Sequence, residues 1–383
     1  MGKRVEEFKD LEERLLEEEE DKDYGLSYWQ LVWRKFRRDK AALLGGGILI
    51  LFYITMVFFA EFFAPYHLET RFIEHINAPP QRFHFIDTNG RFHLRPFVYG
   101  LKQEVDFETF TKVFKEDRSR VYPVRFFVRG DSYRLMGLFP GNIHLFGVEG
   151  QGTIFLFGTD RQGRDLFSRI FYGGRISLTV GLVGVFLSIF FGTVIGIASG
   201  YYGGTVDNIV QRSIEFLMSF PAIPLWMGLA AALPPDWSSI KVYFGITIIL
   251  SVIGWGSLAR QIRGKVLSLR EEEYILAAKA MGAGEGSIIF THLLPNCFSH
   301  IIVIATLSIP GMILGETSLS FLGLGIKPPM TSWGVLLQEA QNVRTVVQTP
   351  WLLIPVGFVI LTVLCFNFLG DGLRDAADPF VRI

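Results

Sequence analysis

Four ionisable side chains stand close together in the sequence at Asp160, Arg161, Arg164 and Asp165. Two carboxyl groups held close together can act as general acid and general base, so this spacing raises the question of catalysis. However, the cluster lies in a glycine-containing stretch in which acidic and basic side chains alternate. That pattern favours a turn held by arginine–carboxylate pairs. We therefore predict a salt-bridged turn here and assign no catalytic residue.

The chain offers no recognisable metal, redox or nucleotide site of its own. Its 2 cysteines, Cys297 and Cys365, and its 7 scattered histidines lack the spacing of zinc ligands. A phosphate-binding loop needs a glycine, four residues and then Gly-Lys-Ser or Gly-Lys-Thr. The run Arg263-Gly264-Lys265 lacks both the upstream glycine and the following hydroxyl residue. We expect the chain to bind no cofactor or metal and to hydrolyse no ATP itself.

The most specific pattern is a set of small, aromatic and turn-forming residues with helical spacing. Its members are Tyr274, Ala277, Ala278, Lys279, Gly282, His292, Leu294 and Pro295. Ser268 followed by Glu271 is a capping box and predicts a helix that starts near Leu269. This helix should end at Gly282 and Gly284, which supply positive φ.

A second short helix is predicted over residues 285–293, because the residue before Pro295 is driven out of the helical region. The pattern then reads as a helix-turn-helix whose alanines leave its corner slim enough to enter a groove on a partner. An ordinary amphipathic helix in a loop between membrane spans is the alternative interpretation.

The composition indicates a membrane protein. Half of the residues are hydrophobic, the mean hydropathy is +0.34 and only 19% are charged. A membrane span needs about 20 apolar residues. Six windows meet that length: 41–64, 176–199, 206–233, 242–259, 301–325 and 350–369. Pro221 and Pro224 interrupt the third window, so a kinked span is expected there.

The distribution of basic residues predicts the orientation. Five basic residues between Arg34 and Lys40 precede the first span, and five between Arg260 and Lys279 follow the fourth. The opposing short loops carry only Lys241 in one, and Lys327 and Arg344 in the other. Because positive residues stay inside, we expect both termini and the helix-turn-helix to be cytoplasmic.

Residues 66–157 form the one sizeable segment outside the spans, and we expect a compact β-rich extracytoplasmic domain there. Asn89-Gly90 predicts a hairpin with a two-residue type I′ turn. Gly130-Asp131 predicts a turn between two further strands. A structural cap and a docking surface for an external protein both fit this domain, whereas binding of nucleic acid does not. Residues 5–23, rich in charge, are predicted to form a marginal surface helix or a disordered tail.

Glu316, Ser318 and Ser320 are the candidate residues of a translocation pathway. A glutamate inside a span is costly to bury, so it faces a cavity or a partner. A hydrogen-bonded packing glutamate at the end of the span is the alternative.

The helix-turn-helix resembles the cytoplasmic "EAA" loop of binding-protein-dependent ABC transporter permeases. Ala277, Ala278, Gly282, Leu294 and Pro295 are in register with that loop, whereas Leu276 replaces its glutamate and His292 its isoleucine. The local form is similar to the C-type subunit of the dipeptide/oligopeptide branch. Residues 158–178 and 367–379 are similar to further segments of that subunit, and the resemblance covers about 25–65 and 155–380.

The resemblance implies a mainly α, polytopic membrane protein with six transmembrane helices of the type I importer permease core. The parts would be a cytoplasmic region 1–40, a first helix 41–65, the domain 66–157, a core 158–372 with a coupling loop 263–300, and a cytoplasmic tail 373–383. The chain would be one half of a translocation pathway in the cell (inner) membrane. Its partners would be membrane lipid, a second permease subunit, two ATPase subunits that use ATP and Mg, and an extracytoplasmic substrate-binding protein.

The resemblance implies di- or oligopeptides as substrates, with oligosaccharides or nickel as alternatives. A secondary transporter or channel is a distant alternative, because the paired intramembrane charges or inverted repeats typical of that class are not evident. An intramembrane hydrolase would need a catalytic constellation within a span, and we find none.

Overall fold

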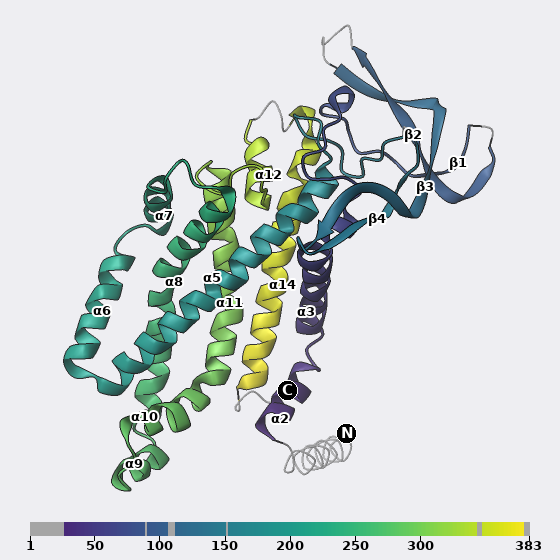
Figure 1. Cartoon of the computed structure of the whole chain (residues 1–383). Coiled ribbons are helices and arrows are strands. Elements are labelled where there is room, and N and C mark those ends of the chain that lie inside the picture. The colour runs from purple at the N-terminus through teal and green to yellow at the C-terminus, as the bar shows by residue number, and fades with distance from the viewer. Residues whose placement is uncertain (1–26, 89, 106–111, 151, 343–346, 379–383) are drawn as a thin grey trace, which may run out of the picture.

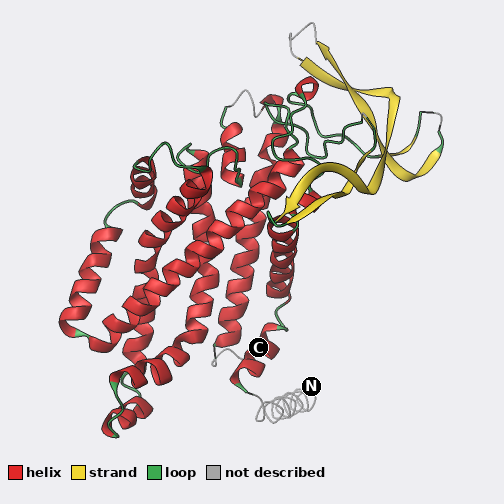
Figure 2. Ribbon diagram, viewed as in Figure 1, coloured by secondary structure: helices red, strands yellow, loops and turns green. Residues whose placement is uncertain are grey.

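The computed structural model describes residues 27–88, 90–105, 112–150, 152–342 and 347–378. Long helices form a bundle, and one antiparallel sheet lies at one end of it (Figure 1; Figure 2). In this part of the chain, five helices are long and apolar enough to cross a membrane, or six if one bent pair counts as a single span. The predicted polytopic helical fold is confirmed at this level. The charged region 5–23 lies outside the described residues.

A short helix, α2 (Tyr28–Phe36), precedes the first span. The span itself consists of α3 (Lys40–Phe52) and the π-helical turn η1 (Tyr53–Phe58), and the short helix α4 (Ala60–Phe63) follows it. Asp39 caps α3 by accepting hydrogen bonds from the N–H groups of Ala41 and Ala42. Near the other end, Arg175 donates to both carboxylate oxygens of Glu61, at 2.7 and 2.5 Å. This buried pair fixes the end of the first span to the next long helix.

A four-stranded antiparallel sheet follows the first span, with the order β1-β2-β3-β4. The elements of this region are η2 (Ile73–His75), β1 (His84–Ile86), β2 (Phe92–Val105), β3 (Lys112–Leu135) and β4 (Phe139–Val148). Val98, Val124, Phe146 and Ile154 form its small buried core. The prediction of a β-rich domain is thus confirmed.

Two details of the predicted strands are wrong. The β1–β2 loop has three residues instead of two, because Asp87 N–H bonds to Arg91 O and Gly90, at φ +77°, lies inside the loop; Asn89 itself is outside the described residues. Nor does the chain turn at Gly130-Asp131, since β3 continues to Leu135 with only a register shift. The Asp131 carboxylate accepts hydrogen bonds from the His67 N–H and the Thr70 hydroxyl, which bend β3 toward the first span.

The remaining helices form the bundle. They are α5 (Leu166–Tyr202), α6 (Gly204–Met218), α7 (Ala222–Ala231), α8 (Ser239–Leu269), α9 (Glu273–Ala280), α10 (Glu285–Ser287), the π-helical turn η3 (Ile288–Leu293), α11 (Leu294–Phe321), α12 (Trp333–Glu339), the 3-10 turn η4 (Pro350–Leu353) and α14 (Ile354–Ala377). The predicted kink in the third span is confirmed as a break, with α6 and α7 at 83° to each other. Pro221 stands at that break because it can donate no backbone hydrogen bond.

Helices α5 and α8 pack closely through glycines spaced by four. A Cβ atom on Gly196 would lie 2.6 Å from the Ala259 carbonyl oxygen, and one on Gly192 would lie 2.8 Å from Leu258 Cβ. Small residues at these positions let the two backbones approach, which is a common way to join helices in a membrane. The two helices therefore form a firm pair whose ends carry the segment described next.

Candidate functional site

The residues singled out in the helix-turn-helix pattern lie on an exposed corner at the end of the bundle opposite to the sheet (Figure 1). We call residues 273–293 the corner segment. It begins later than predicted, because α8 extends to Leu269 and Ser268 lies in its last turn. Arg270 N–H bonds to Val266 O at 2.9 Å, and the Arg270 guanidinium donates to Gly200 O at 3.0 Å. These bonds outweigh the local capping signal of Ser268, so the predicted capping box is wrong.

The corner itself is a Schellman motif at Gly282. Gly282 has φ +81°, its N–H bonds to Lys279 O, and Ala283 N–H bonds to Ala278 O, both at 3.0 Å. The positive φ predicted for Gly282 is confirmed. The same prediction for Gly284 is wrong, because Gly284 is the N-cap of α10 at φ −67°.

The second half of the corner segment does not stop before Pro295. Instead α10, η3 and α11 form one continuous helix from Glu285 to Phe321. Leu294 N–H bonds to Ile289 O in the π-helical register, and Pro295 falls in the first turn of α11. A π-helical turn inserts one extra residue, which relieves the clash that a proline ring makes with the preceding turn.

One face of the corner segment is buried against the bundle. Ile275, Ile288 and Leu293 are at most 2% exposed, and Ala278 is 4% exposed. The three larger side chains pack in a cluster with residues of α5, α8 and α11, including Ile262. Ala278, one of the alanines predicted to keep the corner slim, is buried as well. The segment is fixed to the helices that it joins.

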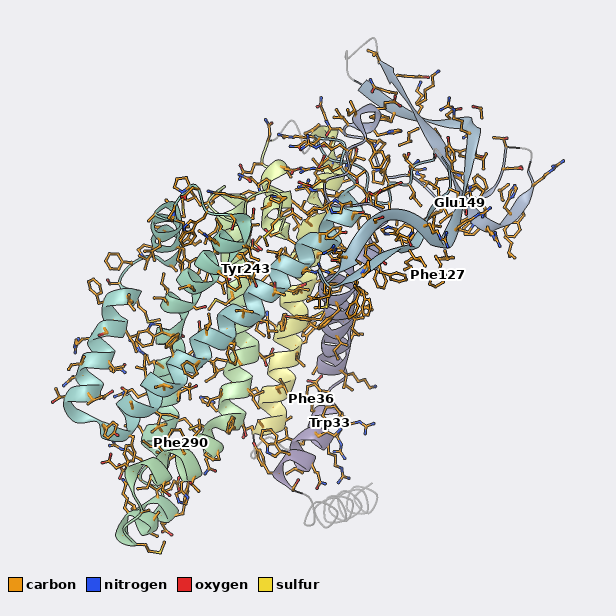
Figure 3. The ribbon with its side chains drawn as sticks, in the orientation of Figure 1. Trp33, Phe36, Phe127, Glu149, Tyr243 and Phe290 are labelled. Atoms are coloured by element: carbon orange, nitrogen blue, oxygen red, sulfur yellow. The ribbon has the colours of Figure 1, made fainter. Side chains whose placement is uncertain are left out.

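The opposite face is exposed and apolar. Tyr274, Leu276, Phe290 and Met281 have exposed fractions of 41, 48, 70 and 82%. We call these four residues the apolar face; Figure 3 shows Phe290 at this end of the bundle. Exposed apolar residues gathered on one surface mark a binding site for a partner.

The other predicted residues of the pattern lie around this corner. Ala277, Lys279 and Gly282 are exposed, as is Pro295, whereas Leu294 is half-buried. The half-buried His292 ring lies 6.4 Å from the Tyr274 ring, so the two halves of the segment meet there.

Sequence reasoning missed two tyrosines that hold the corner segment from α5. Lys279 Nζ lies 5.6 Å from the centre of the Tyr201 ring, and the Tyr202 hydroxyl donates to Glu285 Oε2 at 3.2 Å. The only signal in the sequence was an aromatic pair just before Gly203, where a helix end is expected. Through these contacts, the corner segment is joined to the end of α5.

The ionic cluster near the sheet is a salt-bridged turn, as predicted. Asp160 accepts from Arg164 Nε at 2.7 Å and pairs with Arg169, and both arginines also reach Glu339 at 2.9 Å. Asp165 instead caps α5 by accepting from the Ser168 N–H at 2.8 Å. The network joins α5 to α12 and thus serves packing.

The candidate pathway residues are divided between two environments. Glu316 is fully buried and accepts hydrogen bonds from the hydroxyls of Ser177 and Ser320, at 2.9 and 2.7 Å. Ser318 is half-buried, and its hydroxyl donates to Leu314 O. Ser177 also accepts from Trp333 N–H, so the cluster joins α5, α11 and α12. Among the described residues, no group of three or more His, Cys, Asp or Glu side chains could hold a metal ion.

Fold and site together define a polytopic membrane protein with an exposed corner, partly apolar on its surface, at one end of its helix bundle. Residues 192–383 match the family of binding-protein-dependent transport system inner membrane components. Residues 27–80 match the N-terminal transmembrane domain of oligopeptide transport permease C. The chain belongs to this family and is a multi-pass inner-membrane permease subunit of an ABC importer.

Named relatives are similar over more than half of the chain. The chain is 46% identical over 224 residues to the oligopeptide transport system permease protein OppC of Haemophilus influenzae, covering 58% of this chain and 70% of that protein. It is 42% identical over 236 residues to the dipeptide transport system permease protein DppC of Alkalihalophilus pseudofirmus, covering 61% and 75%. Residues 81–191, which include the sheet, lie outside both family matches.

Proposed function

We propose that this permease imports di- or oligopeptides and that its ATPase subunits bind the apolar face of the corner segment. The ATPase contact is supported by the difference between the two faces of the corner segment, one of which is buried and the other exposed. Ile275 and Leu293 anchor it to the bundle, whereas Met281 and Phe290 remain exposed. The peptide substrate is supported by the names of the OppC and DppC relatives.

The proposed assembly is an importer of this chain, a second permease subunit, two ATPase subunits that use ATP and Mg, and an extracytoplasmic binding protein. Nucleotide-driven closure of the ATPases would push the corner segment, and the attached helices would move between inward-open and outward-open states. Such a shift requires that nucleotide or substrate bind one state more tightly than the other. Glu316, Ser318 and Ser320 stay proposed pathway residues.

The proposed orientation places the corner segment and both termini in the cytoplasm and the sheet outside. Basic residues before the first span, and in the last part of α8 and just beyond it, support this arrangement. It is also supported by the location of the corner segment and the sheet at opposite ends of the bundle (Figure 1). The domain division follows the same order, with the region 66–157 as the external unit and 158–372 as the permease core with its coupling loop 263–300.

Reconstitution of the importer in liposomes tests the proposal. With cognate ATPases, second permease subunit and binding protein, ATP should drive uptake of a labelled peptide, and omission of the ATPases should abolish it. Uptake that persists without the ATPases would favour a secondary transporter or channel. Uptake of nickel or an oligosaccharide in place of the peptide would refute the substrate but not the ATPase contact.

A further inference from the structure

The β3–β4 hairpin is held rigidly against the end of the first span. The two ring nitrogens of His144 lie 2.5 Å from Ala64 O and 3.0 Å from Asp131 O. The Asp131 carboxylate accepts from the His67 N–H at 3.0 Å and from the Thr70 hydroxyl at 2.9 Å. These hydrogen bonds therefore fix the position of the hairpin relative to α4.

The same hairpin exposes a set of large apolar side chains. Phe126, Phe127, Met136, Leu138 and Phe139, which we call the hairpin patch, have exposed fractions of 67, 67, 50, 73 and 67%. Successive residues of a strand point to opposite faces, so the exposure of both Phe126 and Phe127 means that neither is covered by the sheet core. A water-facing domain gains nothing from such a surface.

Phe127 is turned toward the membrane span by a strained backbone. Its φ is +56°, a conformation that bulky residues rarely adopt. Its ring lies 6.2 Å from the ring of Phe62 on α4. Figure 3 shows Phe127 on the underside of the curved hairpin, near the upper end of α3.

The surface below Phe62 belongs to the first span. Ile54, Phe58 and Phe59 are 44, 45 and 42% exposed, and Ile54 and Phe58 lie within the membrane-length helix Lys40–Phe58. Through Phe62, the Phe127 end of the hairpin patch therefore adjoins a helix surface made for contact with lipid. Phenylalanines at this height match the aromatic belt found at membrane–water interfaces.

Basic side chains accompany the patch. Arg129 and Arg134 are exposed on the same hairpin, and Arg125, also exposed, pairs with Glu149 at 2.8 Å. A guanidinium group forms paired hydrogen bonds to phosphate, and its stem can lie along apolar surface. The boundary between lipid headgroups and acyl chains favours aromatic residues that lie next to arginines.

We propose that the β3–β4 hairpin rests in the bilayer, with the hairpin patch among the upper acyl chains and its arginines at the lipid phosphates. This contact would anchor the sheet to the membrane beside the first span. It would thereby fix the position of the whole domain over the permease. This inference requires only the membrane embedding of the first span and does not depend on the substrate or on the ATPase contact.

Site-directed spin labelling of the assembled importer in phospholipid nanodiscs tests the proposal. Single cysteines are placed at Phe127 and Leu138 after Cys297 and Cys365 are replaced by serine. Ile54 serves as the lipid-facing control. Leu94, which is 88% exposed on β2, is the matched apolar control in water. Collision rates with oxygen, which concentrates in lipid, and with a water-soluble nickel chelate are then compared.

Labels at Phe127 and Leu138 should show an oxygen-to-nickel ratio close to that at Ile54 and several-fold above that at Leu94. A ratio equal to that at Leu94 would refute lipid contact. Labels shielded from both reagents would show that a protein subunit covers the patch, which also refutes it. Peptide uptake by each labelled importer confirms that the variant is folded.

Discussion

The Lys279 ammonium group lies 5.6 Å from the centre of the Tyr201 ring, within reach of a cation–π interaction. Lys279 belongs to the corner segment, whereas Tyr201 ends α5, the long helix that also forms the buried pair between Arg175 and Glu61. The contact therefore connects the proposed ATPase-binding corner to a helix that runs the length of the bundle.

Replacement of Tyr201 by leucine should weaken this connection. The cation–π interaction at an exposed site contributes about 0.5–1 kcal/mol, so peptide-stimulated ATPase activity should fall by a factor of about 2–5. Tyr201→Phe keeps the ring face and should retain the activity. Equal activities of the leucine and phenylalanine variants would contradict a role for the ring.

Replacement of Gly282 by valine should impair both transport and the ATPase activity that transport stimulates. A Cβ atom at Gly282 would meet nothing within 4 Å, so the effect must act through its φ of +81°. That conformation costs a residue with a side chain on the order of 1 kcal/mol or more. Uptake and stimulated ATPase activity should both fall while membrane insertion is retained.

The matched control for Gly282→Val is Gly284→Ala. Gly284 is equally open in space but has φ −67°, which alanine adopts readily. This variant should transport normally. Normal coupled transport by Gly282→Val would count against the corner as a lever.

Replacement of Arg169 by methionine should destabilise the fold. Asp160 is fully buried, and loss of a buried partner costs about 3 kcal/mol even though Arg164 remains. Thermal unfolding in detergent measures the effect. Lys115→Met, which removes the exposed pair with Glu104, should have a much smaller effect, because water screens that pair. Similar losses for the two variants would mean that the buried network adds little.

The stability of the subunit should depend on the protonation of Asp165. Burial raises the pKa of Asp165 to about 7, although hydrogen bonds from Ser168 oppose the rise. Its pKa in the unfolded chain is about 3.9, so the native state binds this proton more tightly. The contribution to stability is fully present below pH about 4 and is lost as the pH rises through about 7.

Asp165→Asn tests this dependence, because an amide keeps an oxygen that can accept from Ser168 but cannot titrate. Unfolding midpoints measured from pH about 5 to about 8 should fall less steeply in the variant than in the parent protein. Parallel curves would show that Asp165 does not titrate in this range.

Cysteine labelling in intact cells should reveal the orientation. A cysteine at Leu94 should react with a membrane-impermeant thiol reagent from outside, whereas one at Ala277 should react only after the membrane is opened. Ala277 is the suitable probe because it is exposed, whereas Ala278 is buried. Labelling of Ala277 from outside would contradict the proposed contact with ATPases, since ATP is available on the cytoplasmic side.

Much of this architecture was predictable because its signals are local. Apolar windows predicted the spans, Pro221 predicted the break between α6 and α7, and Gly282 predicted the corner. Each of these depends on solvation or backbone sterics of nearby residues.

The details that failed depend on partners distant in sequence. Arg270 holds the end of α8 through Gly200, and Asp131 bends β3 through His67 and Thr70. No local sequence pattern predicts hydrogen bonds between residues so far apart in the chain. Likewise, Glu339 joins the turn at Asp160 only because α12 packs beside α5.

The helix from Glu285 to Phe321 is continuous, so a movement of the small corner can act on residues far away from it. At 1.5 Å per residue, Glu285 and Glu316 stand roughly 47 Å apart along one rod. Pivoting that rod by about 5° about one end would shift the other by about 4 Å, comparable to the pitch of a helical turn. An event at the ATPase can therefore reach the serine-lined carboxylate of Glu316 as a change of angle, without any bond inside the helix being broken.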